Sequence, residues 1–109
     1  MASRYRVRWA PAAVRDLDEI IDYVAARRSV DAAVKLYLQL KSRVATLATQ
    51  PARGRIVPEL RDVGVSEYRE LIVMRYRVFF RISGREVGVV AVLDGRRDVE
   101  EALFRRALG

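Results

Sequence analysis

The stretch RYRVFFRI, residues 75–82, decides the fold of this chain because two kinds of side chain alternate along it. A period of two residues is the pattern of a β-strand, whose successive side chains point to opposite faces of the sheet. One face would then pack on a core while the other carries three guanidinium groups. The apolar set is Tyr76, Val78, Phe80 and Ile82, and the opposite set is Arg75, Arg77, Phe79 and Arg81.

Two further strands are predicted beside this one, over residues 67–73 and 86–93, because both segments are rich in Val, Ile and Leu. The turn Ser83-Gly84-Arg85 has the length of a hairpin connection. Residues 4–9 also alternate, with arginines at every second position, and predict an N-terminal strand that pairs with this meander. We therefore expect a mainly antiparallel four-stranded sheet.

Two amphipathic helices are predicted between the first strand and the meander. Pro11 suits the first turn of a helix that runs to about Arg27, and Ser29 is an expected N-cap for a second helix, which Pro51 stops. Residues 51–66 should form a long loop with one helical turn at 58–61. Asp98 and Glu101 fit the capping box of a short C-terminal helix.

The order of these elements predicts one α+β domain over residues 1–109, near the commonest domain size. The short connection between the helices makes them a long hairpin, which should pack on one face of the sheet. The other face is expected to stay partly open.

Composition restricts the chemistry. The chain has no cysteine and no histidine, so we expect no metal site and no cofactor, and any catalysis would need Arg, Lys, Tyr or carboxylates. The formal charge of +7 indicates an anionic partner, although solubility and codon usage explain it equally well. No apolar run is long enough for a membrane span or an export signal, which predicts a cytoplasmic protein.

The arginines form the candidate binding site. Arg75, Arg77 and Arg81 are expected on the open sheet face, across from Arg69 of the neighbouring strand, and Arg96 and Arg97 follow the last strand in LDGRRD. Such a cluster is most easily kept when an anion neutralises it. The alternative is that these side chains only solubilise the face, with Glu67, Glu70 and Glu86 as ion-pair partners.

Four segments in this order resemble the toxins of the RelE/ParE superfamily of type II toxin–antitoxin modules: YRVRWAPAAVRDLDEIIDYVA, PELRDVGVSEYREL, RYRVFFRI and VVAVLDGRRDVEEAL. The resemblance covers nearly the whole chain and agrees with the predicted hairpin and sheet. It implies a growth-inhibiting toxin neutralised by a cognate ParD-like or RelB-like antitoxin, which alone would bind the operator DNA.

The resemblance leaves two possible molecular targets for the toxin, the translating ribosome and DNA gyrase. RelE-like members cut mRNA in the ribosome, and Arg69, Arg77 and Arg97 fill three positions of their site. Two other positions of that site, which carry proton-transfer groups in RelE-like members, fall at Leu71 and at Leu103 or Phe104. Tyr68 and Tyr76 could replace those groups, but their pattern favours structural roles.

ParE-like members lack the nuclease residues, have a long hairpin and poison DNA gyrase. We therefore expect a gyrase poison of the plasmid-stabilisation type with no catalytic residues. A ribosome-dependent, metal-independent endoribonuclease is the alternative, and a nucleic-acid-binding module without toxicity is a third hypothesis.

Overall fold

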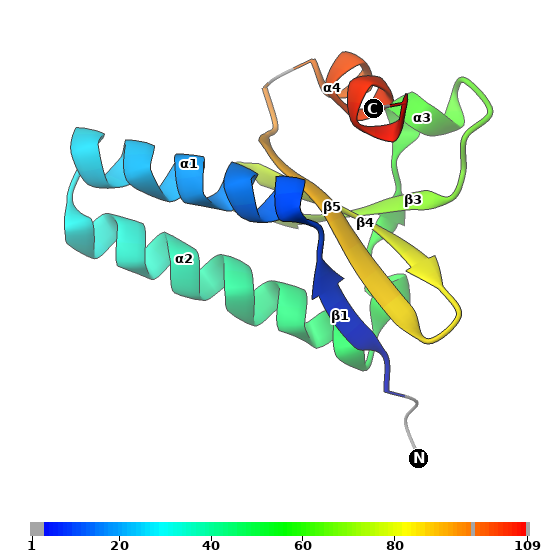
Figure 1. Cartoon of the computed structure of the whole chain (residues 1–109), viewed down its shortest axis with the longest axis horizontal. Helices are drawn as coiled ribbons and strands as arrows, with labels where there is room; N and C mark the ends of the chain where they lie inside the picture. Colours follow the sequence, from blue (N-terminus) through cyan, green and yellow to red (C-terminus); the bar gives the residue numbers. More distant parts are fainter. Residues whose placement is uncertain (1–3, 97, 109) are drawn as a thin grey trace.

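The computed structural model describes residues 4–96 and 98–108. It contains four helices and five strands within those residues (Figure 1). None of the helices is long and apolar enough to cross a membrane. In chain order the elements are β1 (Arg6–Trp9), α1 (Pro11–Arg27), α2 (Val30–Ala45), β2 (Arg55–Ile56), α3 (Pro58–Arg61), β3 (Tyr68–Val73), β4 (Tyr76–Ser83), β5 (Glu86–Asp94) and α4 (Val99–Leu108), with single 3₁₀ turns at Thr46–Ala48 and Pro51–Arg53.

The helical hairpin forms where it was predicted, but its second helix ends at Ala45, before a 3₁₀ turn at Thr46–Ala48, and does not continue to Pro51. Pro11 is the first residue of α1, where its missing N–H leaves no hydrogen bond unmade. The Ser29 hydroxyl accepts a hydrogen bond of 3.0 Å from the Ala32 N–H and so caps α2. The predicted terminal helix is capped in the same way, because the Asp98 carboxylate accepts from the Glu101 N–H at 3.1 Å.

The sheet has five strands in the order β1-β5-β4-β3-β2, so the prediction of four was wrong by one. The extra strand is β2, two residues long, which pairs antiparallel with β3 at Arg69 and Glu70. A strand this short shows no period-two pattern, so it could not be predicted from the sequence. As expected, β1 joins the meander; it pairs parallel with β5, and the other pairings are antiparallel.

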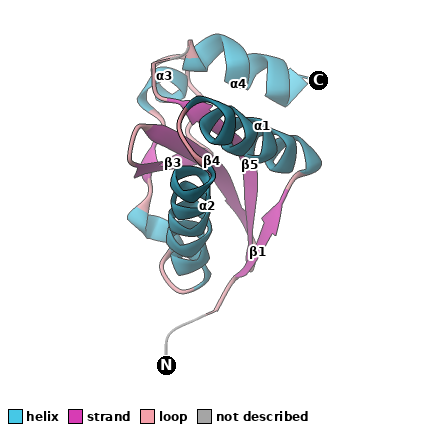
Figure 2. Cartoon of the chain, turned by 90° about the vertical axis from the view of Figure 1, so that its left-hand side faces the viewer, coloured by secondary structure: helices cyan, strands magenta, loops and turns pink. Residues whose placement is uncertain are grey.

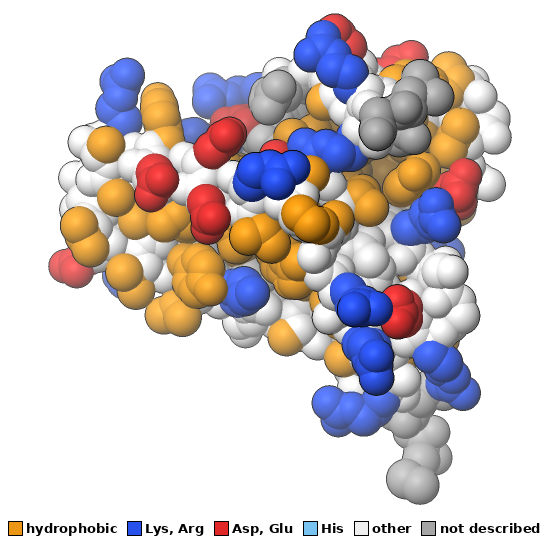
Figure 3. All heavy atoms as spheres, viewed as in Figure 1, with side chains coloured by type: hydrophobic (Ala, Val, Ile, Leu, Met, Phe, Trp, Pro, Cys, Tyr) orange, Lys and Arg blue, Asp and Glu red, His pale blue; other side chains and the backbone are white. Residues whose placement is uncertain are grey.

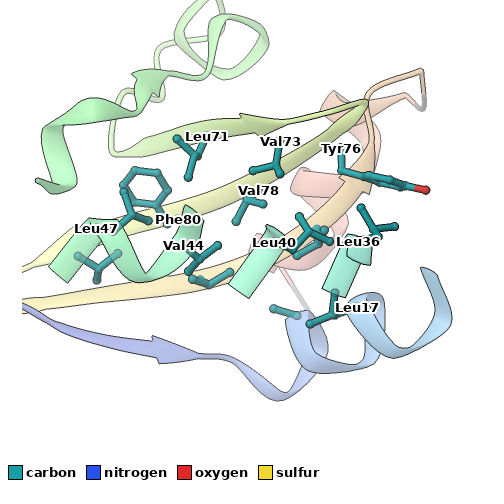
Figure 4. Close-up of a cluster of buried hydrophobic side chains, with 14 of the residues drawn as sticks. Leu17, Leu36, Leu40, Val44, Leu47, Leu71, Val73, Tyr76, Val78 and Phe80 are labelled. Atoms are coloured by element: carbon teal, nitrogen blue, oxygen red, sulfur yellow. The ribbon is translucent and has the colours of Figure 1, made fainter. Parts of the chain in front are cut away.

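The main core lies between the hairpin and one sheet face, which we call the hairpin face (Figure 2). Figure 4 shows leucines and valines of α1 and α2 pointing toward the side chains of β3 and β4. The apolar set of β4 belongs to this core, since Tyr76, Val78 and Phe80 are buried in it and Ile82 packs against it. The alternation of RYRVFFRI therefore predicted the buried side of the strand correctly.

The opposite face of the sheet is half covered, and more of it is closed than the sequence suggested. A second core there joins Phe79, Ala91 and Leu93 of the sheet to side chains of α3 and α4. The two helices contact each other above this part of the sheet (Figures 1 and 2). The covering residues are few and scattered, namely Val57, Leu60, Val99 and Leu103.

A β-bulge in β5 anchors α4 to this arrangement. The register between β4 and β5 shifts at Phe79 and Phe80, which leaves two polar backbone groups of β5 for side chains to satisfy. Asp16 of α1 accepts from the Val92 N–H at 3.0 Å, and Arg106 of α4 donates to the Val90 carbonyl at 2.6 Å. Because Asp16 and Arg106 also pair with each other at 3.1 Å, three elements are joined at the bulge.

Candidate functional site

The six arginines of the predicted site do not form one cluster. Arg77 is largely buried under α3, Arg69 lies on the hairpin face, and Arg81 lies near the far end of β4. Arg75 and Arg96 lie together, at the β3–β4 turn and after β5. The sixth, Arg97, lies outside the described residues. The expected nest of guanidinium groups on an open sheet face was therefore wrong.

Arg77 is held in what we call the Arg77 clamp, formed with Glu59 of α3 and with Glu70 of β3. The two terminal nitrogens of Arg77 donate to the two Glu59 oxygens at 2.7 and 2.8 Å. Its Nε and Nη2 donate to Glu70, the latter at 2.9 Å, and Arg55 Nε donates to Glu70 at 2.8 Å. The guanidinium also stacks over Phe79, at 5.2 Å from the ring centre.

The electrostatics of the clamp favour its charged state. The bidentate hydrogen bond from Arg77 lowers the pKa of Glu59 to about 2, against the opposing effect of burial. The same hydrogen bond raises the pKa of Arg77 above its usual value. Glu70 is only 1% exposed, so its charge depends on these partners for stabilisation. With 11% of its side chain exposed and most of its N–H donors engaged, Arg77 is saturated by carboxylates of its own chain.

Arg69 points away from Arg77. It lies opposite Phe80 in the β3–β4 register, and paired residues share a face, so its side chain is on the hairpin side. There it donates to the Gly54 carbonyl at 2.8 Å. A Cβ at Gly54 would lie 2.5 Å from the Phe80 ring, so only glycine fits this close approach. A placement of Arg69 across from the β4 arginines depended on the strand register, and the observed register pairs Arg69 with Phe80 instead.

The side chains at the two positions that carry proton-transfer groups in RelE-like toxins cannot transfer protons here. Leu71 and Leu103 are buried in the two cores, and Phe104 packs against the second. Tyr76 is buried in the main core and Tyr68 packs against the second core, as their pattern predicted. Within residues 4–96 and 98–108, no group of three acidic side chains is placed to hold a metal ion.

A groove of about 950 Å³ lies where the tip of the hairpin, around the α1–α2 connection, meets the β3–β4 turn. Arg75 and Arg96 stand on its sheet side and share one carboxylate, Asp94, at 3.3 Å each. Hydrogen bonds from the Arg96 backbone and side chain lower the pKa of Asp94. The end of α1 and the start of α2 add three more cations, Arg27, Arg28 and Lys35.

The groove combines cationic and apolar side chains. Five of its lining residues are Lys or Arg, and none is Asp or Glu. Tyr23 and Leu38 of the hairpin and Met74 of the turn present apolar surface to solvent, with Leu38 59% and Met74 64% exposed. Figure 3 shows apolar side chains gathered over the hairpin. One sign of this site is visible in the sequence, because Leu38 falls outside the apolar stripe of its helix.

Met74 is also strained. Its φ of 57° lies in the left-handed region, where it is the only described residue other than glycine. Asn, Asp or Gly is usual at such a turn position, and a long apolar side chain there carries a cost in free energy. A strained, exposed methionine beside a groove is therefore a candidate contact for a binding partner.

Comparisons with known proteins agree with this fold. The sequence model described as "ParE toxin of type II toxin-antitoxin system, parDE" matches residues 7–99. The curated protein "Putative toxin Y4kP" of Sinorhizobium fredii is 32% identical over 103 residues, which are 93% of this chain and 99% of that protein.

Solved toxins share the fold at lower identity. A chain of the chromosomal ParDE system of P. aeruginosa superposes with a TM-score of 0.68 at 22% identity, over 82% of this chain and 94% of that one. The RelBE2 toxin–antitoxin complex of Mycobacterium tuberculosis gives a TM-score of 0.55 at 20% identity, over 84% and 92%. A mutant of E. coli RelE gives 0.63 at 14% identity, over 99% and 96%. By its sequence match across most of its length, the chain belongs to the ParE toxin family of the RelE/ParE superfamily.

Proposed function

We propose that this protein is the toxin of a type II toxin–antitoxin module and arrests growth by binding and poisoning DNA gyrase in the cytoplasm. The observation that carries this proposal is the Arg77 clamp. RNA cleavage of the RelE kind would use the guanidinium of Arg77 to hold the scissile phosphate. In this chain two carboxylates already occupy that guanidinium.

The lack of proton-transfer groups supports the same conclusion. General acid and base groups each contribute about 10²- to 10⁴-fold to such reactions. Leu71 stands at one of the positions that would carry them, and Leu103 or Phe104 stands at the other; Leu71 and Leu103 are buried and Phe104 packs against the second core. A site without these groups and with a neutralised Arg77 would cleave RNA poorly, whereas a poison that acts by binding needs neither.

The groove is the proposed docking site of the cognate antitoxin. Its five cations without a lining carboxylate favour an acidic partner, and its exposed Tyr23, Leu38 and Met74 favour a partner that inserts apolar side chains. An amphipathic helix with acidic flanks meets both requirements. A second copy of this chain fits poorly, since both copies carry a charge of +7.

Ribosome-dependent mRNA cleavage is the alternative. It is favoured by the similarity of the fold to E. coli RelE over 99% of this chain. In that case Arg77 would have to release Glu59 and Glu70 before it could hold a phosphate.

Two reactions with the purified protein separate these functions. In the first, gyrase and supercoiled plasmid are incubated with the toxin and then treated with detergent and protease. Gyrase poisoning predicts linear DNA, and prior addition of antitoxin should remove it. In the second, programmed ribosomes are incubated with the toxin and the mRNA 3′ ends are mapped. Codon-spaced cuts without linear DNA would overturn the proposal.

A further inference from the structure

Three arginines lie at the uncovered end of the sheet face opposite the hairpin, and they take part in neither the Arg77 clamp nor the groove. In the register, Arg8 of β1 lies opposite Gly88 of β5, and Gly88 lies opposite Arg81 of β4. Paired residues point to the same face, so the two arginines flank a bare glycine about 10 Å apart, or two strand spacings. Arg6 stands two residues before Arg8 on the same face. We call Arg6, Arg8 and Arg81 the arginine platform.

The platform is open to solvent. The second core covers the other half of this face, around Phe79, Ala91 and Leu93. The side chains of Arg8 and Arg81 are 64% and 47% exposed. Figure 3 shows Lys and Arg side chains gathered at the lower end of the molecule, where Figure 1 places β1 and the β4–β5 turn.

The charges of the platform are weakly compensated. Arg8 pairs with Glu86 and Arg81 with Glu67, each at 3.5 Å, and the two carboxylate side chains are themselves 45% and 60% exposed. Exposed pairs at such distances contribute little. Arg6 makes no ion pair with any side chain that the structure describes.

The side chains around the arginine platform indicate which kind of anion it would bind. None of the large apolar side chains exposed in residues 4–96 and 98–108 lies on β1 or β5, so the platform offers no anchor for a lipid or an amphipathic helix. No exposed aromatic ring is present there to stack an unpaired base. A flat array of guanidinium groups fits a rigid row of phosphates, and duplex DNA carries a charge about every 1.7 Å along its axis.

We infer that the arginine platform binds the phosphate backbone of duplex DNA, without reading its sequence. The choice of DNA over RNA rests on the proposed action at gyrase, which would hold a DNA duplex beside the toxin. The binding would be direct and separate from recognition of the operator by the antitoxin.

Fluorescence anisotropy with a labelled 24-base-pair DNA tests this inference. The triple variant Arg6→Ala, Arg8→Ala, Arg81→Ala is compared with Arg15→Ala, Arg53→Ala, Arg61→Ala, which removes the same charge from exposed sites elsewhere. The platform variant should bind at least tenfold more weakly at 50 mM NaCl. The slope of log affinity against log salt should fall by about 3, roughly one per lost phosphate contact. The control variant should stay within threefold and keep its slope.

A second pair of variants leaves every arginine in place. At Gly88 an added Cβ would have its nearest neighbour at 4.0 Å, so a side chain fits there. Gly88→Glu puts a carboxylate between Arg8 and Arg81 and should weaken DNA binding about tenfold, while Gly88→Gln, of equal size, should change it less than threefold.

Equal losses in both triple variants, or in both Gly88 variants, would overturn the inference, because binding would then follow net charge or shape alone. Tighter binding of duplex RNA of the same sequence would also overturn it. The proposed gyrase poisoning has a separate test, because it would be contradicted by the absence of linear DNA in the gyrase reaction.

Discussion

The Arg77 clamp and the groove both contain arginines, yet the two sites leave these arginines in opposite states. In the clamp, Arg77 meets two carboxylates and is 11% exposed. At the groove, Arg75 and Arg96 share one carboxylate, and the lining itself contributes none. The difference teaches that the number of arginines on a strand says little about binding. What matters is how much of their charge the fold itself neutralises.

The largest effect is expected from breaking the clamp. Arg77→Ala removes two hydrogen bonds from the buried Glu70 and both from Glu59, and should lower the free energy of unfolding by about 3 kcal/mol. For a domain of this size the melting temperature should fall by roughly 10 to 20 °C. Thermal unfolding followed by circular dichroism measures this. A change below about 0.5 kcal/mol would show that Arg77 is not needed by the fold.

The groove should show the reverse pattern, with binding lost and folding kept. Leu38→Glu places a negative charge where an acidic partner is proposed to insert apolar side chains. Affinity for the antitoxin should fall about 100-fold, or about 2.7 kcal/mol, in titration calorimetry. Val63→Glu is the control, since Val63 is an exposed apolar residue of similar size outside the groove. Equal affinities for the two variants would remove the groove as the docking site.

Acid should weaken the clamp in a defined range of pH. The pKa of Glu59 is lowered to about 2 in the folded protein, so its carboxylate stabilises the fold above its ordinary pKa of 4.5. This stability is lost as the pH falls from about 5 toward 2. Because Glu59 is about one-third exposed, we expect only about 1 kcal/mol after allowance for solvent screening. Urea unfolding between pH 2 and 6 measures it, and Glu59→Gln should reduce the pH dependence.

The smallest effect is predicted for Met74→Gly. Glycine relieves the strain of a positive φ but gains freedom in the unfolded chain, so stability should change by less than about 0.5 kcal/mol. Antitoxin affinity should fall about fivefold, since the exposed thioether leaves the groove. A loss of stability with unchanged affinity would mean that Met74 serves the fold instead.

Much of the architecture follows from patterns that are local in the sequence. The alternation in RYRVFFRI and the stripe of α2 identify the two sides of the main core, and Ser29, Asp98 and Pro11 mark helix ends through hydrogen bonds within a few residues. The covered part of the second face was missed, because its cover comes from four apolar residues scattered over α3, α4 and a loop.

The site was harder to predict because its geometry depends on long-range pairing. The face of Arg77 and Arg81 follows from strand parity, but only the folded chain shows that Glu59, eighteen residues before Arg77, reaches its guanidinium. The groove unites the hairpin tip with a turn about 45 residues later, and no motif links these segments. The strained conformation of Met74 could not be predicted, since the sequence does not show a backbone angle.

The central claim is that Arg77 serves the fold through Glu59, and a double-mutant cycle tests it most directly. The free energies of unfolding of the parent, Glu59→Gln, Arg77→Gln and the double variant give the coupling between the two side chains. A coupling of about 1 to 2 kcal/mol is predicted, against nearly zero in the matched cycle of Glu59→Gln with Arg81→Gln. No coupling between residues 59 and 77 would contradict the claim and leave Arg77 available for a phosphate.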